Sequence, residues 1–496
     1  MSIDRLVVGR FVATVISLLV VFSAWSCAAS QKVNGNKVVN PLQYGLKQAK
    51  TGEDCYRVLF RTHQDALKIG AAVSYAGIKH IKLTIPDNAK SIPLTHYTDF
   101  AGVTIQVENK KKGMFLFTLS SKLIPVSVKG KEIDNGDFTH HPVLKGGNKL
   151  LVISDKTLWV QERIGYGKGY ERKDIMLVED GRGGNSPVQS YSTSTSKPDC
   201  YYCDVDVKRK NVIKNVTFIR TATSTEKTYF VKIENQYNVQ VIGVNINTPS
   251  GSELYGDKLI YIVNCVDVKL KDISVRGTYS LPRQAGYGVS IHNIYNLYVE
   301  NMYGRANWGV FGNHNVNLAY LKNCDINRFD VHCYGRDVKF ENCNFVDLYN
   351  QFSGMYGEIS FKNCVFTNCH PVLIEGSYNA FTPFDLYFYG CNFNFDEKHP
   401  GIVYFSSFSN EDNDRPELRE KSLPNVMIKN CSVKLSGGLT KWYVFNIKKV
   451  KGYKGRFSYI TKVEIDGLSV NGKGYEMKVY NNEVRTLNKV KLTKKR

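Results

Sequence analysis

Five short segments of this chain repeat one pattern, a strand-like alternation of apolar and polar residues that ends in Asn-Cys or Gly-Cys. Successive cysteines of the set are 19, 21, 27 and 40 positions apart. A period-two strand that returns at such intervals indicates a backbone that coils on itself, with one or two turns between signals. The sequence therefore predicts an all-β parallel β-solenoid. The five cysteines are Cys324, Cys343, Cys364, Cys391 and Cys431.

Stacked coils turn each repeat position into a ladder along the axis, because equivalent residues lie about 4.8 Å apart. Asn at a turn can then bond to Asn of the next coil, and Cys fits a tight interior corner as a small apolar side chain. We therefore expect the five cysteines to be buried thiols. Cys200 and Cys203 remain a candidate disulfide, and a zinc site there is weaker because no second pair with ligand spacing follows.

The first residues have the form of an export signal. Arg5 and Arg10 precede an apolar run over 11–24 that is too short for a confident membrane span. We interpret 1–26 as the signal peptide of an exported protein, periplasmic or outer-membrane-associated in a Gram-negative bacterium, or secreted. Cys27 resembles a lipoprotein cleavage box and predicts a lipid anchor, whereas cleavage after Ser30 is the competing interpretation.

The formal charge of +21 is concentrated near the C-terminal end. Residues 427–496 contain 17 Lys and Arg against 4 Asp and Glu. Export argues against nucleic acid as the partner of these cations, so we expect an acidic polysaccharide that carries sulfate or uronate groups. The same composition is also typical of a solvated chain end.

The chain between the signal and the tail is expected to form one monomeric rod. From Cys55 to about Gly77 the apolar spacing predicts an amphipathic helix that covers the open end of the solenoid, and a strand follows over His80–Ile85. Two or three strands per coil then predict a right-handed parallel β-helix. The expected parts are a polar leader over 27–54, an N-terminal cap with irregular coils or an inserted lobe over 55–204, the β-helix over 205–475 and a basic tail over 476–496.

Two triplets of polar residues recur at about the length of one coil in the middle of the chain. The histidines are 22 and 18 positions apart, and the arginines are 22 and 23 apart. On one outward face, neighbouring guanidinium groups would repel each other until a polyanion bound. The alternative is that the coils do not align these residues and they are scattered on the surface. The triplets are His292, His314 and His332, and Arg283, Arg305 and Arg328.

Asp330 and His332 are two positions apart on a strand, so both side chains point to the same face, and Arg328 shares their parity. The carboxylate can orient the imidazole or stabilise its charged form. A purely structural hydrogen bond at a coil corner is the alternative.

The segments Gly309-Val-Phe-Gly312 and Arg328-Phe-Asp-Val-His332 look like those of the pectate-lyase-like β-helix proteins of gut-bacterial glycan degradation and of phage tail appendages. The coil pattern carries the resemblance over 205–475, although only about 30 residues match at the level of motifs. The resemblance implies a polysaccharide lyase, possible substrates being glycosaminoglycans such as chondroitin sulfate or hyaluronan.

Lyase chemistry requires neutralisation of the sugar carboxylate, a base for the C5 proton and an acid for the leaving oxygen. Arg305 and Arg328 are the candidates for the first task, without a metal. His332 assisted by Asp330 is the candidate base, and Tyr334 or His292 the candidate acid. For substrate binding we expect Arg283, Tyr287, Asn307, Trp308, His314 and Arg336, of which the aromatic residues can stack on sugar rings or serve as ordinary packing.

The alternatives to a lyase are a glycoside hydrolase and a non-catalytic glycan-binding solenoid. A hydrolase needs two carboxylates about 5–10 Å apart, for which Asp330 with Glu375 or Asp347 are the candidates. We interpret His140 and His141, outside the coils, as part of a solvated loop. No acidic cluster of the pectate-lyase kind is evident, so we expect no cofactor, while a divalent cation such as calcium is the open alternative.

Overall fold

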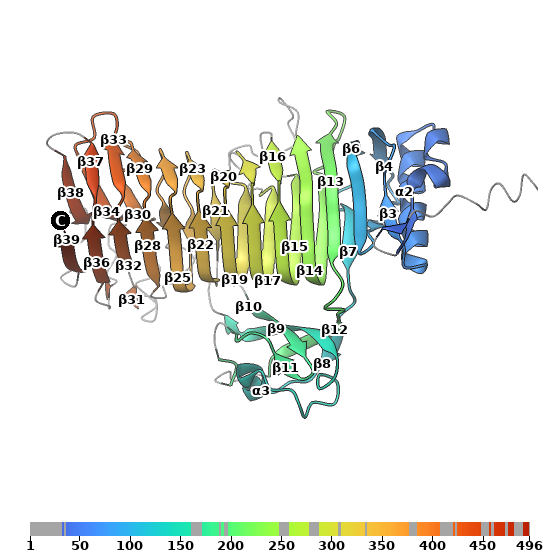
Figure 1. The fold of residues 1–496 in the computed structure, drawn as a ribbon, viewed down its shortest axis with the longest axis horizontal. Helices are drawn as coiled ribbons and strands as arrows, with labels where there is room; N and C mark the ends of the chain where they lie inside the picture. Colours follow the sequence, from blue (N-terminus) through green and yellow to red (C-terminus); the bar gives the residue numbers. More distant parts are fainter. Residues whose placement is uncertain are drawn as a thin grey trace, which may run out of the picture.

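The computed structural model of the chain is shown in Figure 1. The predicted signal peptide over 1–26 and the predicted lipid anchor at Cys27 lie outside the described residues, as do four predicted site residues, Arg283, Asn307, Trp308 and Tyr334. The structure describes residues 32–33, 36–159, 171–187, 190–192, 197–247, 257–276, 287–305, 309–332, 335–375, 384–406, 420–421, 424–447, 456–457, 461–471, 475–480 and 490–495.

The chain forms a parallel β-helix, a rod in which each coil pairs in parallel with the next. The strands stack in three rows, and long strands bend from one row to another. Row A consists of β5 (Ile92–Pro93), β7 (Phe115–Ser120), the first parts of β14 (Tyr229–Asn247), β15 (Lys258–Lys271), β17 (Val289–Glu300) and β19 (Phe311–Lys322), then β21 (Phe329–Val331), β24 (Gln351–Phe352), β27 (Val372–Ile374), β30 (Gly401–Phe405), β34 (Lys441–Ile447) and β38 (Glu476–Tyr480).

Rows B and C complete each coil. Row B consists of β2 (Asn36–Val39), β3 (Ala72–Ser74), the first parts of β6 (Tyr97–Asn109) and β13 (Asn211–Arg220), the later parts of β14, β15, β17 and β19, then β22 (Gly335–Glu341), β25 (Met355–Lys362), β28 (Asp385–Tyr389), β32 (Asn425–Lys429), β36 (Thr461–Asp466) and β39 (Val490–Lys495). Row C consists of β4 (His80–Ile85), the ends of β6, β13 and β14, then β16 (Ser274–Arg276), β18 (Tyr303–Gly304), β20 (Asp325–Ile326), β23 (Asn344–Val346), β26 (Val365–Thr367), β29 (Asn392–Phe395), β33 (Ser432–Leu435) and β37 (Ser469–Asn471).

The repeated Asn-Cys pairs form the expected ladders at the turn from row B to row C. Asn323, Asn342 and Asn363 adopt left-handed φ values of 53–54°, a conformation that Asn tolerates better than most residues. Nδ2 of Asn342 donates to Oδ1 of Asn323 at 3.4 Å, and Asn363 donates to Asn342 at the same distance. The five cysteines of the repeat are buried free thiols, which confirms their predicted place in the core.

The N-terminal end is covered by helix α2 (Gly52–Lys68), which contacts β3, β4 and β5 (Figure 1). Its buried face includes Leu59, His63 and Ala66, while Thr51 caps its first turn. The helix was expected to extend to about Gly77, which is wrong. It ends at Lys68 because Gly70 takes a left-handed φ of 65° and the amide of Ala71 bonds back to the carbonyl of Ala66, a common helix stop.

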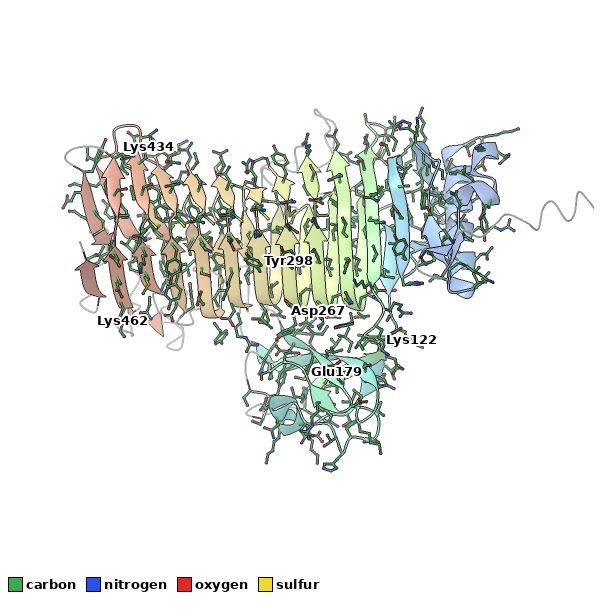
Figure 2. All side chains as sticks on the ribbon, viewed as in Figure 1. Lys122, Glu179, Asp267, Tyr298, Lys434 and Lys462 are labelled. Carbon is green, nitrogen blue, oxygen red and sulfur yellow. The ribbon has the colours of Figure 1, made fainter. Side chains whose placement is uncertain are left out.

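A separate lobe is inserted between β7 of row A and β13 of row B (Figure 1). One of its cores includes Val266 of the rod, so the lobe packs against the corner between rows A and B. Figure 2 shows Glu179 and Asp267 on the two sides of this boundary. The lobe consists of β8 (Ile124–Val126), α3 (Gly130–Asn135), β9 (Asn148–Trp159), β10 (Glu171–Glu179), β11 (Arg182–Gly183) and β12 (Asp199–Asp204), and its strands order as β11-β10-β9-β12-β8.

The candidate disulfide between Cys200 and Cys203 is not formed, because residues three apart on strand β12 face opposite sides of the sheet. Cys200 lies in the core of the lobe, and Cys203 lies in the core between lobe and rod. The two thiols are therefore ordinary packing groups of two different cores. Burial raises the pKa of Cys200 to about 12 and that of Cys203 to about 11.

The parallel ladder extends beyond both ends of the range 205–475 expected for the β-helix. At the start, β2 to β7 already pair into rows A, B and C, with η1 (Pro41–Tyr44) and η2 (Leu46–Gln48) between β2 and α2, and β1 (Lys32–Val33) pairs with β2. At the end, β38 and β39 continue rows A and B, so the expected basic tail adds a further coil. The pair of β31 (Glu420–Lys421) and β35 (Arg456–Phe457) lies apart from the rows.

Among the residues that the structure describes, none of the helices has the length and hydrophobicity that crossing a bilayer requires.

Candidate active site

The outward side of row A carries the three histidines that the sequence singled out. The strand register pairs His292 with His314, and it pairs Asn313 with Val331, which places His332 beside His314 in the next coil. The ring centroids of His292 and His314 lie 4.8 Å apart, as do those of His314 and His332. The predicted alignment of the histidines on one face is therefore confirmed.

A hydrogen-bonded network surrounds the last of these histidines. Nε of Arg328 donates to Oδ1 of Asp330 at 2.7 Å, and the hydroxyl of Tyr287 donates to Oδ2 of the same carboxylate at 2.5 Å. The Tyr287 oxygen also lies 2.8 Å from Nε2 of His332. Nη2 of Arg328 donates to the side-chain carbonyl of Gln351 at 3.1 Å. Four residues from three coils are thereby joined to one buried carboxylate.

Strand parity and two glycines give the network its geometry. Arg328, Asp330 and His332 are alternate residues along β21 and its flanks, so they point to the same side. A Cβ on Gly312 would lie 2.3 Å from the Tyr287 ring, and a Cβ on Gly309 would lie 2.7 Å from Cδ of Arg328. The aromatic ring and the guanidinium stem therefore occupy space that any other residue at 309 or 312 would fill.

The side chains of the network differ in their exposure to solvent. The side chain of Asp330 is fully buried and that of Arg328 is 4% exposed, whereas His332 is 12% exposed. Burial alone would raise the pKa of Asp330, but the charge of Arg328 and the ring of His332 hold it below its usual value. Burial alone would lower the pKa of Arg328, but Asp330 and the phenols of Tyr287 and Tyr349 raise it. The buried pair is thus ionised, and His332 is the more accessible group above it.

His292 is a poor acid in this setting. Burial, with a further contribution from the charge of Lys258, lowers the pKa of His292 to about 3. Its ring is neutral near pH 7 and has no acidic proton of the imidazolium kind to donate. The expectation that His292 protonates a leaving group does not fit this environment.

Arg305 and Arg336 do not join the network, contrary to expectation. Arg305 lies at the end of β18 on row C, where its guanidinium pairs with Asp325 of β20. Arg336 lies on β22 and donates to the carbonyl of Ser186 in the lobe at 3.2 Å. The prediction that Arg305 shares a face with Arg328 is wrong, because the two guanidinium groups belong to different rows.

Of the two expected second carboxylates, one lies on the face of the network. The register pairs Asp330 with Gln351 and Gln351 with Leu373, so Glu375, just past β27, stands in the same line as His332, two coils further on. Glu375 accepts a hydrogen bond from Oγ of Ser406 at 2.6 Å. Asp347 follows β23 on row C and is not part of this face.

Sequence reasoning missed four residues around the network, namely Lys258, Tyr261, Tyr349 and Gln351. The Arg328 guanidinium carbon lies 4.5 Å from the Tyr349 ring centroid, and the ring of Tyr261 lies 5.1 Å from that of His292. Gln351 could have been predicted from the coil length, because it follows Asp330 by 21 positions and pairs with it in the next coil.

The lobe borders the site. Nδ2 of Asn293 donates to the carbonyl of Asp174 in β10 at 3.2 Å, and Lys173 lies close enough to His292 to contribute to the lowering of its pKa. The predicted loop residues His140 and His141 lie between α3 and β9, outside the coils as expected. The lobe therefore meets the rod beside His292, and Figure 1 shows β10 of the lobe next to β17.

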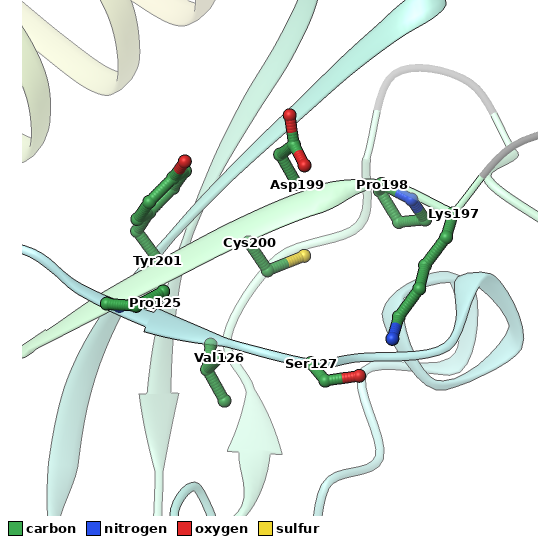
Figure 3. Close-up of a pocket in the computed structure, with 8 residues that line it drawn as sticks. All are labelled: Pro125, Val126, Ser127, Lys197, Pro198, Asp199, Cys200 and Tyr201. Carbon is green, nitrogen blue, oxygen red and sulfur yellow. The ribbon is translucent and has the colours of Figure 1, made fainter.

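A pocket of about 390 Å³ lies within the lobe, along the edge where β8 and β12 pair. Figure 3 shows the Tyr201 ring and the Lys197 ammonium group at opposite ends of the side chains that line it. Its lining residues come from the lobe alone, so this pocket is separate from the network around His332.

Metal ligands are not gathered in the part of the chain that the structure describes, since it contains no group of three or more His, Cys, Asp or Glu side chains placed to hold an ion. The oxygens of Asp330 accept from Arg328, Tyr287 and the backbone amide of Gln351. This carboxylate is therefore committed to protein donors.

Comparison with solved structures finds proteins of the same architecture. The tailspike protein gp49 from Pseudomonas phage LKA1 is 14% identical with a TM-score of 0.52, and the match covers 89% of this chain and 82% of that one. The Gp54 tailspike of Acinetobacter baumannii bacteriophage AP22, solved in complex with an A. baumannii capsular saccharide, is 11% identical with a TM-score of 0.53 over 92% and 76% of the two chains. At these identities the likeness shows the fold alone, a parallel β-helix. No protein-family model and no curated protein sequence matches the chain.

Proposed function

We propose that the protein is an exported polysaccharide lyase that cleaves an acidic, uronate-containing polysaccharide by β-elimination. The observation that carries the proposal is the network in which a buried Asp330–Arg328 pair and the Tyr287 hydroxyl hold His332 on the outward face of row A. A histidine oriented by a buried carboxylate is suited to proton transfer near neutral pH. The AP22 tailspike, which has the same fold, was solved with a capsular saccharide, and this supports a glycan as the ligand.

In this proposal His332 removes the C5 proton of the uronate. Because the Tyr287 hydroxyl donates to Asp330, Nε2 of His332 faces the phenol oxygen as a donor, and Nδ1 is the basic nitrogen of the neutral ring. The imidazolium formed on proton removal is stabilised by Asp330, whose Oδ2 lies 3.3 Å from Nε2. Asp330 and Arg328 position and charge-balance the base and do not touch the sugar.

The other two requirements of β-elimination fall to Tyr287 and Lys258. As the C5 proton leaves and the C4–O bond breaks, a C4–C5 double bond forms and the leaving oxygen takes a proton. We assign this proton to the Tyr287 hydroxyl, which must turn from Asp330 towards the sugar to donate it. Of the two lysines that lower the pKa of His292, Lys258 has the larger effect, and its Nζ lies 5.0 Å from the Tyr261 ring centroid. We assign to Lys258 the neutralisation of the sugar carboxylate, a task first expected of the arginines. Burial lowers the pKa of Lys258, so its ammonium group lies in a poorly hydrated setting where a carboxylate would be a strong partner.

A glycoside hydrolase is the second candidate, and the observation that favours it is Glu375 in the line of His332. Two strand spacings of about 4.8 Å put this carboxylate roughly 10 Å along the axis from the row of Asp330. Asp330 is however fully buried and occupied by protein donors, so it is poorly placed to act on a sugar or a water. A glycan-binding protein without activity is the third candidate.

One experiment separates the three functions. Purified protein is incubated with chondroitin sulfate, hyaluronan and other acidic polysaccharides, with a neutral glucan as control. Ultraviolet absorbance of an unsaturated uronate identifies a lyase, new reducing ends without that absorbance identify a hydrolase, and retention without cleavage identifies a binding protein. A failure to produce the unsaturated uronate from any uronate-containing polymer would sink the lyase proposal.

Export and anchoring are part of the proposal, since a polysaccharide of this class lies outside the cytoplasm. The residues concerned are the signal peptide over 1–26 and Cys27, the site proposed for a lipid anchor. We also propose a monomer and no nucleic-acid partner. Mass spectrometry of the mature N-terminus identifies the lipid, and an unmodified N-terminus beginning after Ser30 would contradict anchoring.

A further inference from the structure

A second polar pocket lies on row A towards the N-terminal end of the rod. Its volume is about 550 Å³, and it borders β5 and β7. Lys112 is exposed there, Lys111 donates to the carbonyl of Ala89 at 2.7 Å, and Lys232 is paired with Glu234 at 2.8 Å. The lining residues that matter here are Lys111, Lys112, Phe115, Thr118, Ser120 and Lys232.

The strand register places this pocket and the network in one line. Successive coils pair the same outward position, so the line runs along the rod axis over five strand spacings of about 4.8 Å, or about 24 Å. The paired positions are Thr118, Lys232, Tyr261, Ser290, Gly312 and Asp330.

A track of aromatic rings follows the same direction. The ring centroids of Phe115 and Tyr261 lie 5.3 Å apart, those of Tyr261 and His292 lie 5.1 Å apart, and the steps to His314 and His332 are 4.8 Å each. All five side chains are partly exposed. The rings of His292 and His314 stack on each other, with an interplanar angle of 12°, so this series presents polar ring edges to a ligand that lies along the rod.

Lysine side chains lie beside these rings as well as in the pocket. Nζ of Lys258 lies 5.0 Å from the Tyr261 ring centroid and 5.7 Å from that of Tyr229, and Nζ of Lys232 lies 6.0 Å from that of Phe115. Lys232 is paired with Glu234 at 2.8 Å, and Asp257 beside Lys258 is paired with the buried Arg220. The pocket therefore has more positive than negative charge among its described side chains, and it suits sulfate or carboxylate groups better than a neutral sugar.

We infer that this pocket is a distal subsite for an acidic sugar of the same chain that is cleaved at His332, so that the polysaccharide lies along row A from the pocket to the network. The inference rests on the proposed function and deepens it, because it names a long anionic glycan as the ligand. A short oligosaccharide at His332 cannot reach across about 24 Å of the rod axis. Affinity therefore grows with chain length until the pocket is filled.

The test compares binding of two chondroitin sulfate oligosaccharides, a decasaccharide and a tetrasaccharide, by titration calorimetry. It uses His332→Ala protein, so that cleavage does not interfere, with Tyr287→Phe as a second inactive background. In each background the pocket is changed by Lys112→Ala with Lys232→Gln, and the matched control is Lys434→Ala, an exposed lysine on row C, away from the pocket (Figure 2). The pocket variant is expected to weaken decasaccharide binding about fivefold more than tetrasaccharide binding.

Equal losses for both lengths, a pocket variant that binds like Lys434→Ala, or a parent protein that does not bind the decasaccharide would each overturn the subsite. The cleavage assay is read separately on wild-type protein. Length-dependent binding that needs Lys112 and Lys232, without any unsaturated product, would support the subsite and reject the lyase. Cleavage that is indifferent to the pocket variant would reject the subsite and leave the lyase.

Discussion

The phenol oxygen of Tyr287 lies 2.8 Å from Nε2 of His332, although 45 positions separate the two residues in the chain. The same oxygen donates to the buried carboxylate of Asp330. Tyr287 therefore connects the accessible base to an ionised pair that lies almost out of reach of solvent. This contact joins four side chains of row A into one hydrogen-bonded network.

Replacement of His332 by Ala is expected to lower activity on an acidic polysaccharide by about 10²- to 10⁴-fold, the usual contribution of a positioned general base. Tyr287→Phe keeps the ring and removes only the hydroxyl that contacts Asp330 and His332, so a comparable loss of activity is expected. Initial rates of unsaturated-uronate formation measure both. His140→Gln is the control, because His140 is an exposed histidine of the lobe, away from the network. Wild-type rates in His332→Ala would remove the catalytic assignment.

The pair of Arg328 and Asp330 is expected to matter for folding as well as for activity. Arg328→Met leaves a fully buried carboxylate without its cation, a change that costs about 3–5 kcal/mol of unfolding free energy. Replacing both residues, by Arg328→Met with Asp330→Leu, removes the charge that is left behind. Denaturant unfolding should therefore show a smaller loss for the double variant than for the sum of the two single ones. Additive losses would contradict a coupled pair.

The sequence carried enough information for the coils and for the histidine line. Repeated Asn-Cys turns marked the corner between rows B and C, and 22 positions from His292 to His314 is the local coil length. Coil length could also have indicated Gln351, 21 positions after Asp330. These successes share one cause, because a solenoid converts regular spacing directly into lateral contact.

The expectation that Arg305 and Arg328 share one face was wrong, because the number of residues per coil differs between row C and row A. From Tyr303 to Asp325 on row C the coil takes 22 residues, but from Phe311 to Phe329 on row A it takes 18. The connection between the rows is four residues shorter in the second coil, so Arg305 stays on row C while Arg328 enters row A. Loop lengths of this kind leave no periodic signal. The position of the Tyr287 ring could not be predicted from spacing either, since it depends on residue 312 being a glycine, which leaves room for the ring.

Acid should destabilise the N-terminal cap through His63. Burial lowers the pKa of His63 to about 3 from 6.5, so between these values the unfolded chain binds a proton that the folded chain does not. Its contribution to stability is complete above about pH 6.5 and falls by about 1.4 kcal/mol per pH unit as the pH drops through this window. His63→Phe is expected to reduce the slope of the unfolding free energy against pH by an amount that corresponds to the uptake of at most one proton on unfolding.

Denaturant midpoints measured from neutral pH down to about pH 4 give this slope. His140→Gln is the matched control, because His140 is exposed in the lobe. Its slope should equal that of the wild type. A His63→Phe protein with an unchanged slope would show that another group governs acid unfolding.

Gly312→Ala should disable the site without unfolding the rod. A Cβ at 312 would lie 2.3 Å from the Tyr287 ring, closer than real contacts allow, so the ring must move and its hydroxyl leaves Asp330 and His332. The strand itself is expected to tolerate Ala, since the three atoms nearest to such a Cβ all belong to the Tyr287 ring and none to the backbone. We expect a loss of activity similar to that of Tyr287→Phe with a cooperative unfolding transition retained. Gly146→Ala in the lobe, where a Cβ meets nothing within 4 Å, is the matched control and should keep full activity. Wild-type activity in Gly312→Ala would mean that the position of the Tyr287 ring is not needed for the reaction.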